Sequence, residues 1–224
     1  HVIEIGPGYG SMTFPIIEMV DSIDVIELDK DLVNHLNEHD QKGLINVIQA
    51  DALKFDFSSL EKKKKIRLIG NLPYHISTPL LFHLLEFSEI FHDFHVMVQK
   101  EVADRMVSGH NNKTYGRLSV AIQSRCSTSK ILDVKPGAFH PKPKVLSSIV
   151  KLEPKQPLEE KVQSKLDGII KMAFNQRRKK IRNSLKDLFT TGMIIESGID
   201  PNARAENLSV NDYIRLSEIE GSTH

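Results

Sequence analysis

The chain has 224 residues, of which 40% are hydrophobic and 26% are charged, and its formal net charge is +1. Such a composition is typical of a globular protein with a sizeable core, either one large domain or one domain plus a small one. The single cysteine, Cys126, excludes an internal disulfide framework and a multi-cysteine zinc site, and it favours a reducing, cytoplasmic compartment. No apolar run approaches the roughly 18 residues of a membrane span, and no signal peptide is evident. Because the sequence opens inside an apparent strand without a start methionine, we expect its natural N-terminus to be missing.

A glycine-rich turn follows the first predicted strand, Val2–Ile5. Gly6, Gly8 and Gly10 precede a helix predicted over residues 11–20. Glycines at such a turn let the backbone approach a ligand closely. The dinucleotide fingerprint needs its third glycine at position 11, which is Ser11 here, so a nicotinamide or flavin dinucleotide is disfavoured and a smaller nucleoside ligand is favoured. A purely structural turn is the alternative.

Two acidic residues mark the ends of the next two predicted strands. Glu27 lies near the end of the strand at 24–29, about 20 residues past the glycines, where a carboxylate accepts hydrogen bonds from both ribose hydroxyls. Asp51 follows the strand at 44–49 and is suited to an adenine amino group. The alternative for Glu27 is a helix-capping or solvated carboxylate. A glycine turn, a Glu and an Asp at three successive strand ends are more specific together than any one alone.

The stretch Asn71-Leu72-Pro73-Tyr74 follows a short apolar strand at 67–69, so it is expected where open α/β sheets bind ligands. The Asn71 amide both donates and accepts hydrogen bonds. Pro73 restrains Leu72 to an extended conformation, which directs the Leu72 carbonyl outward. Tyr74 offers a flat face on which a base can stack. The alternative is an ordinary strand-to-helix turn.

The remaining alternation of strands and helices predicts a largely parallel, doubly wound α/β sheet. A Pro-rich, basic loop at 136–145 carries Phe139, which is either a core residue or an exposed ring for stacking. Pairing of the last strand with a neighbour would bring Phe139 near the strand ends. A run of lysines at 62–65 is typical of a solvated loop, with phosphate attraction as the alternative. The predicted elements are helices at 30–39, 78–87, 100–107 and 115–124, and strands at 94–99, 130–134 and 147–152.

A linker at 153–157 separates this part from a helical C-terminal part, so we predict two domains, residues 1–154 and 155–224. Helices are predicted at 159–174, 175–189 and 209–219, the last with a capping box formed by Ser209 and Asp212. The helix at 175–189 carries six cations against one anion, which favours phosphate binding over a merely solvated face. Its expected RNA-binding residues are Arg177, Arg178, Lys179, Lys180 and Arg182.

Several motifs together resemble the bacterial small-subunit (16S) ribosomal RNA adenine dimethyltransferases, over essentially the whole chain. They are Gly6-Pro7-Gly8-x-Gly10, Val25-Ile26-Glu27-Leu28-Asp29, Gln49-Ala50-Asp51-Ala52, Gly70-Asn71-Leu72-Pro73-Tyr74, Ala138-Phe139-x-Pro141-x-Pro143-Lys144-Val145 and Ala173-Phe174-Asn175-Gln176-Arg177-Arg178-Lys179. The chain differs from the family in having His75 where Asn is expected. It also lacks a basic N-terminal arm with a Gln-Asn-Phe-Leu motif that covers the cofactor.

The resemblance implies a class I methyltransferase with a Rossmann-like fold that uses S-adenosyl-L-methionine. It implies dimethylation of two adjacent adenosines in a hairpin near the 3′ end of small-subunit rRNA, within a precursor of the 30S ribosomal subunit. The target base would leave its stack and lie between two aromatic rings. We expect a monomer without a membrane or metal site. The implied cofactor-binding residues are Gly6, Gly8, Glu27, Asp51, Ala52 and Asn71, and the implied catalytic residues are Asn71, Leu72, Tyr74 and Phe139.

Three alternatives stay open from the sequence. A large-subunit rRNA adenine methyltransferase of the antibiotic-resistance type shares the segment at 174–179 and the loop around Phe139. A DNA adenine methyltransferase is disfavoured, because such enzymes carry an acidic residue or Asn followed by Pro-Pro-Tyr. A ribosome-assembly or RNA-binding factor without turnover is disfavoured by the intact segment Asn71–Tyr74.

Overall fold

The computed structural model describes residues 1–60, 65–139 and 143–219. Three of the four lysines at 62–65, and positions 140–142 of the Pro-rich loop, therefore lie outside the described residues. The described chain forms two compact units. One comprises residues 1–103 and 128–154, and the other comprises residues 104–127 and 155–224. The sequence predicted a single division after residue 154, whereas residues 104–127 group with the C-terminal part of the chain in this division.

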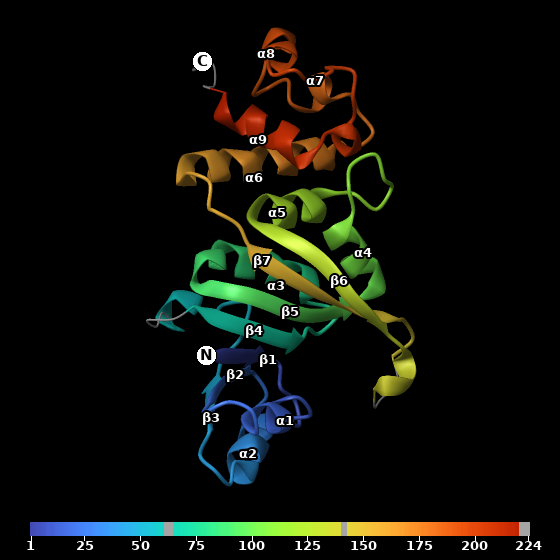
Figure 1. The fold of residues 1–224 in the computed structure, drawn as a ribbon. Helices are drawn as coiled ribbons and strands as arrows, with labels where there is room; N and C mark the ends of the chain where they lie inside the picture. Colours follow the sequence, from blue (N-terminus) through green and yellow to red (C-terminus); the bar gives the residue numbers. More distant parts are fainter. Residues whose placement is uncertain (61–64, 140–142, 220–224) are drawn as a thin grey trace. The chain divides into compact units, whose positions relative to one another are not determined.

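The first unit is built on a seven-stranded sheet with the strand order β3-β2-β1-β4-β5-β7-β6 (Figure 1). Strands β1 to β5 pair in parallel, and β7 pairs with β5 in the antiparallel direction. The predicted doubly wound α/β sheet is therefore confirmed. The strands are β1 Val2–Ile5, β2 Ile23–Glu27, β3 Ile45–Gln49, β4 Ile66–Asn71, β5 Phe91–Gln99, β6 Cys126–Val134 and β7 Ser147–Pro154.

Helices follow most of these strands. The α-helices are α1 Thr13–Ile17, α2 Lys30–His39, α3 Ser77–Glu86, α4 Lys100–Val107, α5 Arg117–Arg125, α6 Glu160–Asn175, α7 Ile181–Ser184, α8 Thr191–Glu196 and α9 Val210–Glu218. The 3-10 helices are η1 Phe57–Leu60, η2 Ser88–Ile90, η3 Pro136–Ala138 and η4 Ala205–Asn207. No helix within the described residues is long and apolar enough to cross a membrane.

The central strands are buried because parallel strands are covered on both faces. All five residues of β2 are buried, including the carboxylates Asp24 and Glu27 beside three apolar side chains. Side chains from β2, β3 and the neighbouring helices form one apolar cluster. The Asp29 carboxylate caps α2 by accepting hydrogen bonds from the Asp31 and Leu32 backbone amides, which fixes where the chain turns from strand to helix.

The pairing of β1 with β4 depends on a glycine. Ile5 lies opposite Gly70 in the parallel register. A Cβ atom at Gly70 would lie 2.9 Å from the Ile5 carbonyl oxygen and 3.2 Å from a methyl carbon of Leu72. Glycine is therefore required at this position for the two strand ends to approach each other.

The second unit is helical, as the sequence indicates. Helices α6 and α9 pack against each other (Figure 1). Their buried faces surround Tyr213, whose hydroxyl donates a 2.8 Å hydrogen bond to the Ala205 carbonyl. The predicted capping box at the start of α9 is confirmed, because the Ser209 hydroxyl and the Asp212 carboxylate bond each other's backbone amides.

Two predicted helices are wrong in extent. The helix predicted at 11–20 is only Thr13–Ile17, and Pro15 in its first turn cannot donate a backbone hydrogen bond to the Ser11 carbonyl. The helix predicted at 175–189 is absent as a continuous element, and only the short α7 forms within it. The Ile181 and Arg182 amides donate to the Ala203 and Pro201 carbonyls, at 2.7 and 3.3 Å, instead of to carbonyls four residues earlier. Tertiary hydrogen bonds thus replace the helical ones.

Gly70→Ala is expected to lower the free energy of unfolding by about 2 kcal/mol, because the added Cβ forces β1 and β4 apart. Urea unfolding measures the change. Gly137→Ala is the matched control in the same unit, since a Cβ there meets no atom within 4 Å. That control is expected to change stability by less than about 0.5 kcal/mol. Equal losses in the two variants would contradict the close-approach argument.

Candidate active site

The candidate site lies at the carboxyl ends of four adjacent strands. Strands β3, β2, β1 and β4 are neighbours in the sheet, and the glycine turn, Glu27, Asp51 and Asn71 each end or follow one of them. Backbone hydrogen bonds connect the carboxyl ends of neighbouring strands. The Gly6 amide donates to the Ile26 carbonyl, and the Ala50 amide donates to the Glu27 carbonyl, each at 3.0 Å. Parallel pairing therefore collects the residues that the sequence predicted for one ligand.

The glycine turn adopts a conformation that only glycine favours. Gly6, Gly8 and Gly10 have φ angles of +67°, +58° and +80°. A Cβ atom at Gly10 would also lie 2.4 Å from the Phe14 ring. The turn is closed by a 2.9 Å hydrogen bond from the Gly10 amide to the Pro7 carbonyl. The glycines thus shape the backbone against the neighbouring cavity.

A cavity of about 600 Å³ opens beside this turn, within the first unit. Its size suits a small nucleoside ligand together with part of a second one. Gly6, Gly8, Asn71, Leu72, Tyr74 and Phe139, all predicted as site residues, line it. The other lining residues are Glu4, Pro7, Tyr9, Ser11, Met12, Pro73, Met97, Ala138 and Pro143.

Asn71, Leu72 and Tyr74 form one wall of this cavity. Asn71 is the last residue of β4 and its side chain is exposed, whereas the Leu72 side chain is fully buried. The Leu72 amide donates a 3.0 Å hydrogen bond to the Met97 carbonyl of β5, which anchors the turn to the sheet. The Ile76 amide then donates to the Pro73 carbonyl at 3.0 Å, so the chain turns directly into α3. The adjacent His75 is exposed.

Phe139 lines the same cavity, although it lies 65 residues after Tyr74 in the chain. It follows η3, and its amide donates a 3.3 Å hydrogen bond to the Pro136 carbonyl. Its ring is half-buried, not packed in the core. Antiparallel pairing of β7 with β5 returns the loop to the carboxyl edge of the sheet, which is why Phe139 and Tyr74 share one cavity.

The Glu27 carboxylate is held in place by backbone amides. Its Oε1 accepts hydrogen bonds from the Leu28 amide at 2.8 Å and the Asp29 amide at 3.0 Å. Its Oε2 accepts one longer hydrogen bond, 3.3 Å, from the Gly8 amide of the glycine turn. Oε1 is thus saturated, while Oε2 faces the turn with lone pairs left for a ligand.

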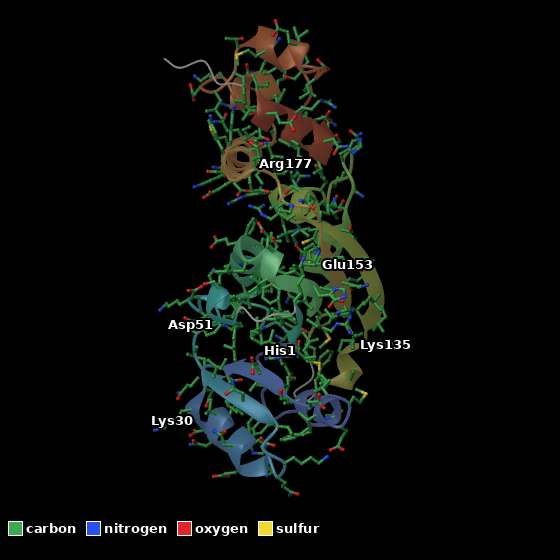
Figure 2. The ribbon with its side chains drawn as sticks, turned by 60° about the vertical axis from the view of Figure 1, so that its left-hand side comes forward. His1, Lys30, Asp51, Lys135, Glu153 and Arg177 are labelled. Carbon is green, nitrogen blue, oxygen red and sulfur yellow. The ribbon has the colours of Figure 1, made fainter. Side chains whose placement is uncertain are left out.

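Asp51 and Ala52 lie farther along the edge and do not line the cavity. Asp51, labelled in Figure 2 on the loop after β3, accepts a 3.0 Å hydrogen bond from the Leu53 amide. Its other carboxylate oxygen lies 3.8 Å from the exposed Lys54 ammonium. Ala52 is half-buried beside it. Glu27 is likewise absent from the cavity wall, so the three residues extend the candidate site beyond the cavity.

Glu4 is a cavity residue that sequence reasoning missed. It is 1% exposed, and its Oε2 accepts a 2.6 Å hydrogen bond from the Thr13 hydroxyl. Its Oε1 is buried without a hydrogen-bond partner among the described residues. Burial, reinforced by the negative charge of Glu27, raises the pKa of Glu4 to about 7 against the opposing effect of Thr13. A charged residue in the middle of an apolar strand, Val2–Ile5, was the available signal.

The predicted RNA-binding residues lie in the second unit, in the turn that follows α6 and at the start of α7. Arg177, labelled in Figure 2, pairs with Glu206 at 2.7 Å and donates a 2.7 Å hydrogen bond to the Lys113 carbonyl. It therefore joins three segments of its own unit. Arg178 and Lys179 are exposed. Lys180 is also exposed and donates to the Asn202 side chain at 3.0 Å, and Arg182 is half-buried.

Within the described ranges, no three His, Cys, Asp or Glu side chains cluster closely enough to hold a metal ion.

Comparison with solved structures agrees with this fold. A dimethyladenosine transferase from Plasmodium falciparum has a TM-score of 0.77 at 24% identity, covering 96% of this chain and 87% of that one. The 23S rRNA methyltransferase ErmE has a TM-score of 0.74 at 22% identity, covering 97% and 89%. These likenesses establish the fold. The strand order and the glycine turn agree with these two structures in defining a Rossmann-like α/β sheet.

The sequence comparisons identify the family. The pattern of the family described as Ribosomal RNA adenine dimethylase matches residues 1–220. A protein of Pasteurella multocida named "Ribosomal RNA small subunit methyltransferase A" is 47% identical over 96% of this chain and 78% of its own length. A protein of the same name from Photorhabdus laumondii is 48% identical over 96% and 81%. The chain belongs to the ribosomal RNA adenine dimethylase family.

The pH dependence of stability tests the state of Glu4. A folded-state pKa of about 7 against an ordinary 4.5 means that folding stability is full below about pH 4.5 and falls as the pH rises through 7. Glu4→Gln removes this loss, so the variant is expected to exceed the wild type by up to about 3 kcal/mol near pH 8. Urea unfolding across this range measures the difference.

Glu38→Gln is the control, because it makes the same substitution at an exposed position of α2. It is expected to shift stability by less than about 0.5 kcal/mol throughout. A gain for Glu4→Gln that is the same at every pH would contradict the raised pKa.

Proposed function

We propose that this chain dimethylates the exocyclic amines of two adjacent adenosines in small-subunit rRNA, with S-adenosyl-L-methionine as the methyl donor. The observation that carries the proposal is the shared cavity. Two hydrogen-bonding positions, Asn71 and Leu72, and two aromatic rings, Tyr74 and Phe139, line it together with the glycine turn. Such an arrangement suits a flat base whose amine is directed at a bound nucleoside.

The residues present fit S-adenosyl-L-methionine. The buried, unpartnered Oε1 of Glu4 suits the positive charge that this molecule carries, which would supply the missing partner. Glu27 Oε2, beside the Gly8 amide, suits the ribose hydroxyls. Asp51 and Ala52, on the loop after β3, would hold the adenine edge. Asn71, between the glycine turn and the base, would contact both ligands.

The chemistry required of the protein is mainly positioning. S-adenosyl-L-methionine supplies an electrophilic methyl group on a positively charged sulfur. The adenine amine is a weak nucleophile, because its lone pair is delocalised into the ring. Hydrogen bonds from the amine to the Asn71 amide oxygen and the Leu72 carbonyl would favour a pyramidal nitrogen and aim its lone pair. Orientation and electrostatic preorganisation would therefore carry the rate.

The target base would be held out of its stack. Tyr74 and Phe139 offer it two faces, which would offset part of the cost of unstacking. The same pocket must admit the monomethylated amine for the second transfer. We infer that its walls are wide enough at Asn71 for one methyl group, consistent with the exposure of that side chain.

The substrate class follows from the relatives and the second unit. Relatives 47% and 48% identical are named for the small ribosomal subunit, which favours that RNA over the large-subunit alternative. Arg178 and Lys179 would contact its phosphates, with Lys180 and Arg182 beside them. An enzyme acting on bacterial ribosomes would work in the cytoplasm.

Asn71→Ala is expected to reduce methylation by at least about a thousandfold, since the amine then loses its main acceptor. RNA affinity is expected to change by less than about threefold, because Asn71 is one contact among many. Single-turnover methylation and filter binding measure the two quantities. Asn37→Ala, at an exposed position of α2 in the same unit as Asn71, is the matched amide control. Wild-type activity in Asn71→Ala would overturn the mechanism.

Replacing Arg178 and Lys179 together by Ala is expected to weaken RNA binding and to lower the slope of log K against log salt by about 1.5. Replacing Lys161 and Lys171, two exposed cations on α6, makes the same charge change as a control. Binding titrations over a range of salt concentrations measure the slope. If both double variants changed the slope equally, the change would reflect the loss of net positive charge and not a contact of Arg178 and Lys179 with RNA.

The whole proposal is tested by incubating the complete protein with radiolabelled S-adenosyl-L-methionine and unmethylated small ribosomal subunits. The RNA is then digested and the labelled nucleoside identified. Dimethyladenosine in small-subunit rRNA is the expected product. Label only in large-subunit RNA would favour the antibiotic-resistance type of enzyme. Tight subunit binding without label would favour an assembly factor.

A further inference from the structure

One polar contact at the cavity has no role in the function described so far. The Tyr74 hydroxyl and the Ser147 hydroxyl lie 2.7 Å apart, within hydrogen-bond distance, with either atom able to donate. Ser147 is fully buried, whereas Tyr74 is half-buried at the cavity wall. A buried hydroxyl needs a partner inside the protein, and Ser147 has one in Tyr74.

The fold puts Ser147 at this place for a topological reason. Ser147 is the first residue of β7 and pairs with Gln99, the last residue of β5. Because β7 runs antiparallel to β5, its beginning lies at the carboxyl edge of the parallel strands, where Asn71 ends β4. Ser147 is therefore a rigid sheet residue next to a turn.

Apart from the bond to Ser147, the hydrogen bonds given for Tyr74 in the described part of the chain hold its backbone and not its ring. The Ser77 hydroxyl donates a 3.2 Å hydrogen bond to the Tyr74 carbonyl at the start of α3, which holds the main chain. It does not restrain the two side-chain torsions of Tyr74. A base stacks well only on a ring that holds one orientation. If the side chain is free before binding, ordering it when the base binds weakens binding. The hydrogen bond between the Tyr74 hydroxyl and Ser147 restrains the side-chain torsions before the base binds.

We propose that Ser147 is a positioning residue, which holds the Tyr74 ring in the plane that a target adenine stacks on. This inference rests on the proposed function, since it assumes that Tyr74 contacts the base. Ser147 itself does not line the cavity. It acts through Tyr74 and contacts no substrate.

The neighbouring serine provides the control. Ser148 is on the same strand and is equally buried, but it lies on the opposite face, and its hydroxyl donates a 2.6 Å hydrogen bond to the Asp133 carboxylate. Ser148→Ala thus removes one buried hydroxyl and one hydrogen bond without touching Tyr74. If the loss of any buried hydroxyl in β7 lowered activity, Ser147→Ala and Ser148→Ala would show the same effect.

The experiment compares Ser147→Ala, Tyr74→Phe, their combination and Ser148→Ala in single-turnover methylation of unmethylated small subunits. Ser147→Ala and Tyr74→Phe are each expected to lower the rate at saturating substrate by about three- to tenfold, with KM for the cofactor unchanged. The combined variant is expected to be no slower than the slower single variant, because both changes remove the same bond. Ser148→Ala is expected to stay within about twofold of the wild type.

A fluorescent base reports the ring directly. With 2-aminopurine at one target position, stacking quenches emission, so Ser147→Ala is expected to give a brighter complex than the wild type or Ser148→Ala. Equal rates and equal emission for Ser147→Ala and Ser148→Ala would overturn the proposal, and so would additive losses in the combined variant.

Tyr74→Ala separates this inference from the proposed function. Full activity in Tyr74→Ala would overturn the stacking role of Tyr74 in the proposed function, and this inference with it. Loss of activity in Tyr74→Ala, with wild-type rates for both Ser147→Ala and Tyr74→Phe, would overturn only the positioning role.

Discussion

The candidate site depends on one packing constraint, the close parallel pairing of β1 with β4. Ile5 and Gly70 lie opposite each other, and the space between them admits no Cβ atom. This pairing puts the glycine turn that follows β1 beside Asn71, the last residue of β4. In the proposed reaction, a methyl donor held by the turn and an amine held by Asn71 would lie close together, so the pairing of these strands would set the reaction geometry. The turn after β4 and the segment after η3 supply the aromatic walls, Tyr74 and Phe139.

The negative charge of the buried Glu4 carboxylate opposes folding, and a cation bound beside it would reduce this cost. Glu4 is buried with one oxygen unpartnered, and its raised pKa shows that the folded chain holds a negative charge there poorly. A positively charged ligand in the cavity would relieve that cost. Glu27, by contrast, is saturated on one oxygen by two backbone amides and stays fixed. The two carboxylates thus differ: Glu4 keeps a buried oxygen without a partner among the described residues, and Glu27 is fixed by backbone amides.

The basic residues of the second unit differ in role: Arg177 makes contacts within the unit, whereas Arg178 and Lys179 are exposed. Arg177 joins Glu206 and the Lys113 carbonyl, so a residue that belongs to a run of cations in the sequence serves as an internal link. The residues directly after it leave the helical path, because the amides of Ile181 and Arg182 bond to Ala203 and Pro201. Arg178 and Lys179 are thereby presented on a turn instead of on a continuous helix face. A compact turn of cations suits an irregular RNA backbone.

The sequence by itself determined the strand-and-helix alternation, the glycine turn, and the candidate residues at four strand ends. These are local features, because period, turn chemistry and motif spacing do not depend on distant contacts. It also indicated the capping box at Ser209. Only the tertiary structure decided that Gly70 admits no side chain, that Glu4 is buried without a full set of partners, and that Tyr74 meets Ser147. It also decided that the predicted helix at 175–189 breaks. Each of these depends on pairs of residues far apart in the chain, whose approach is set by strand register and packing rather than by any local pattern.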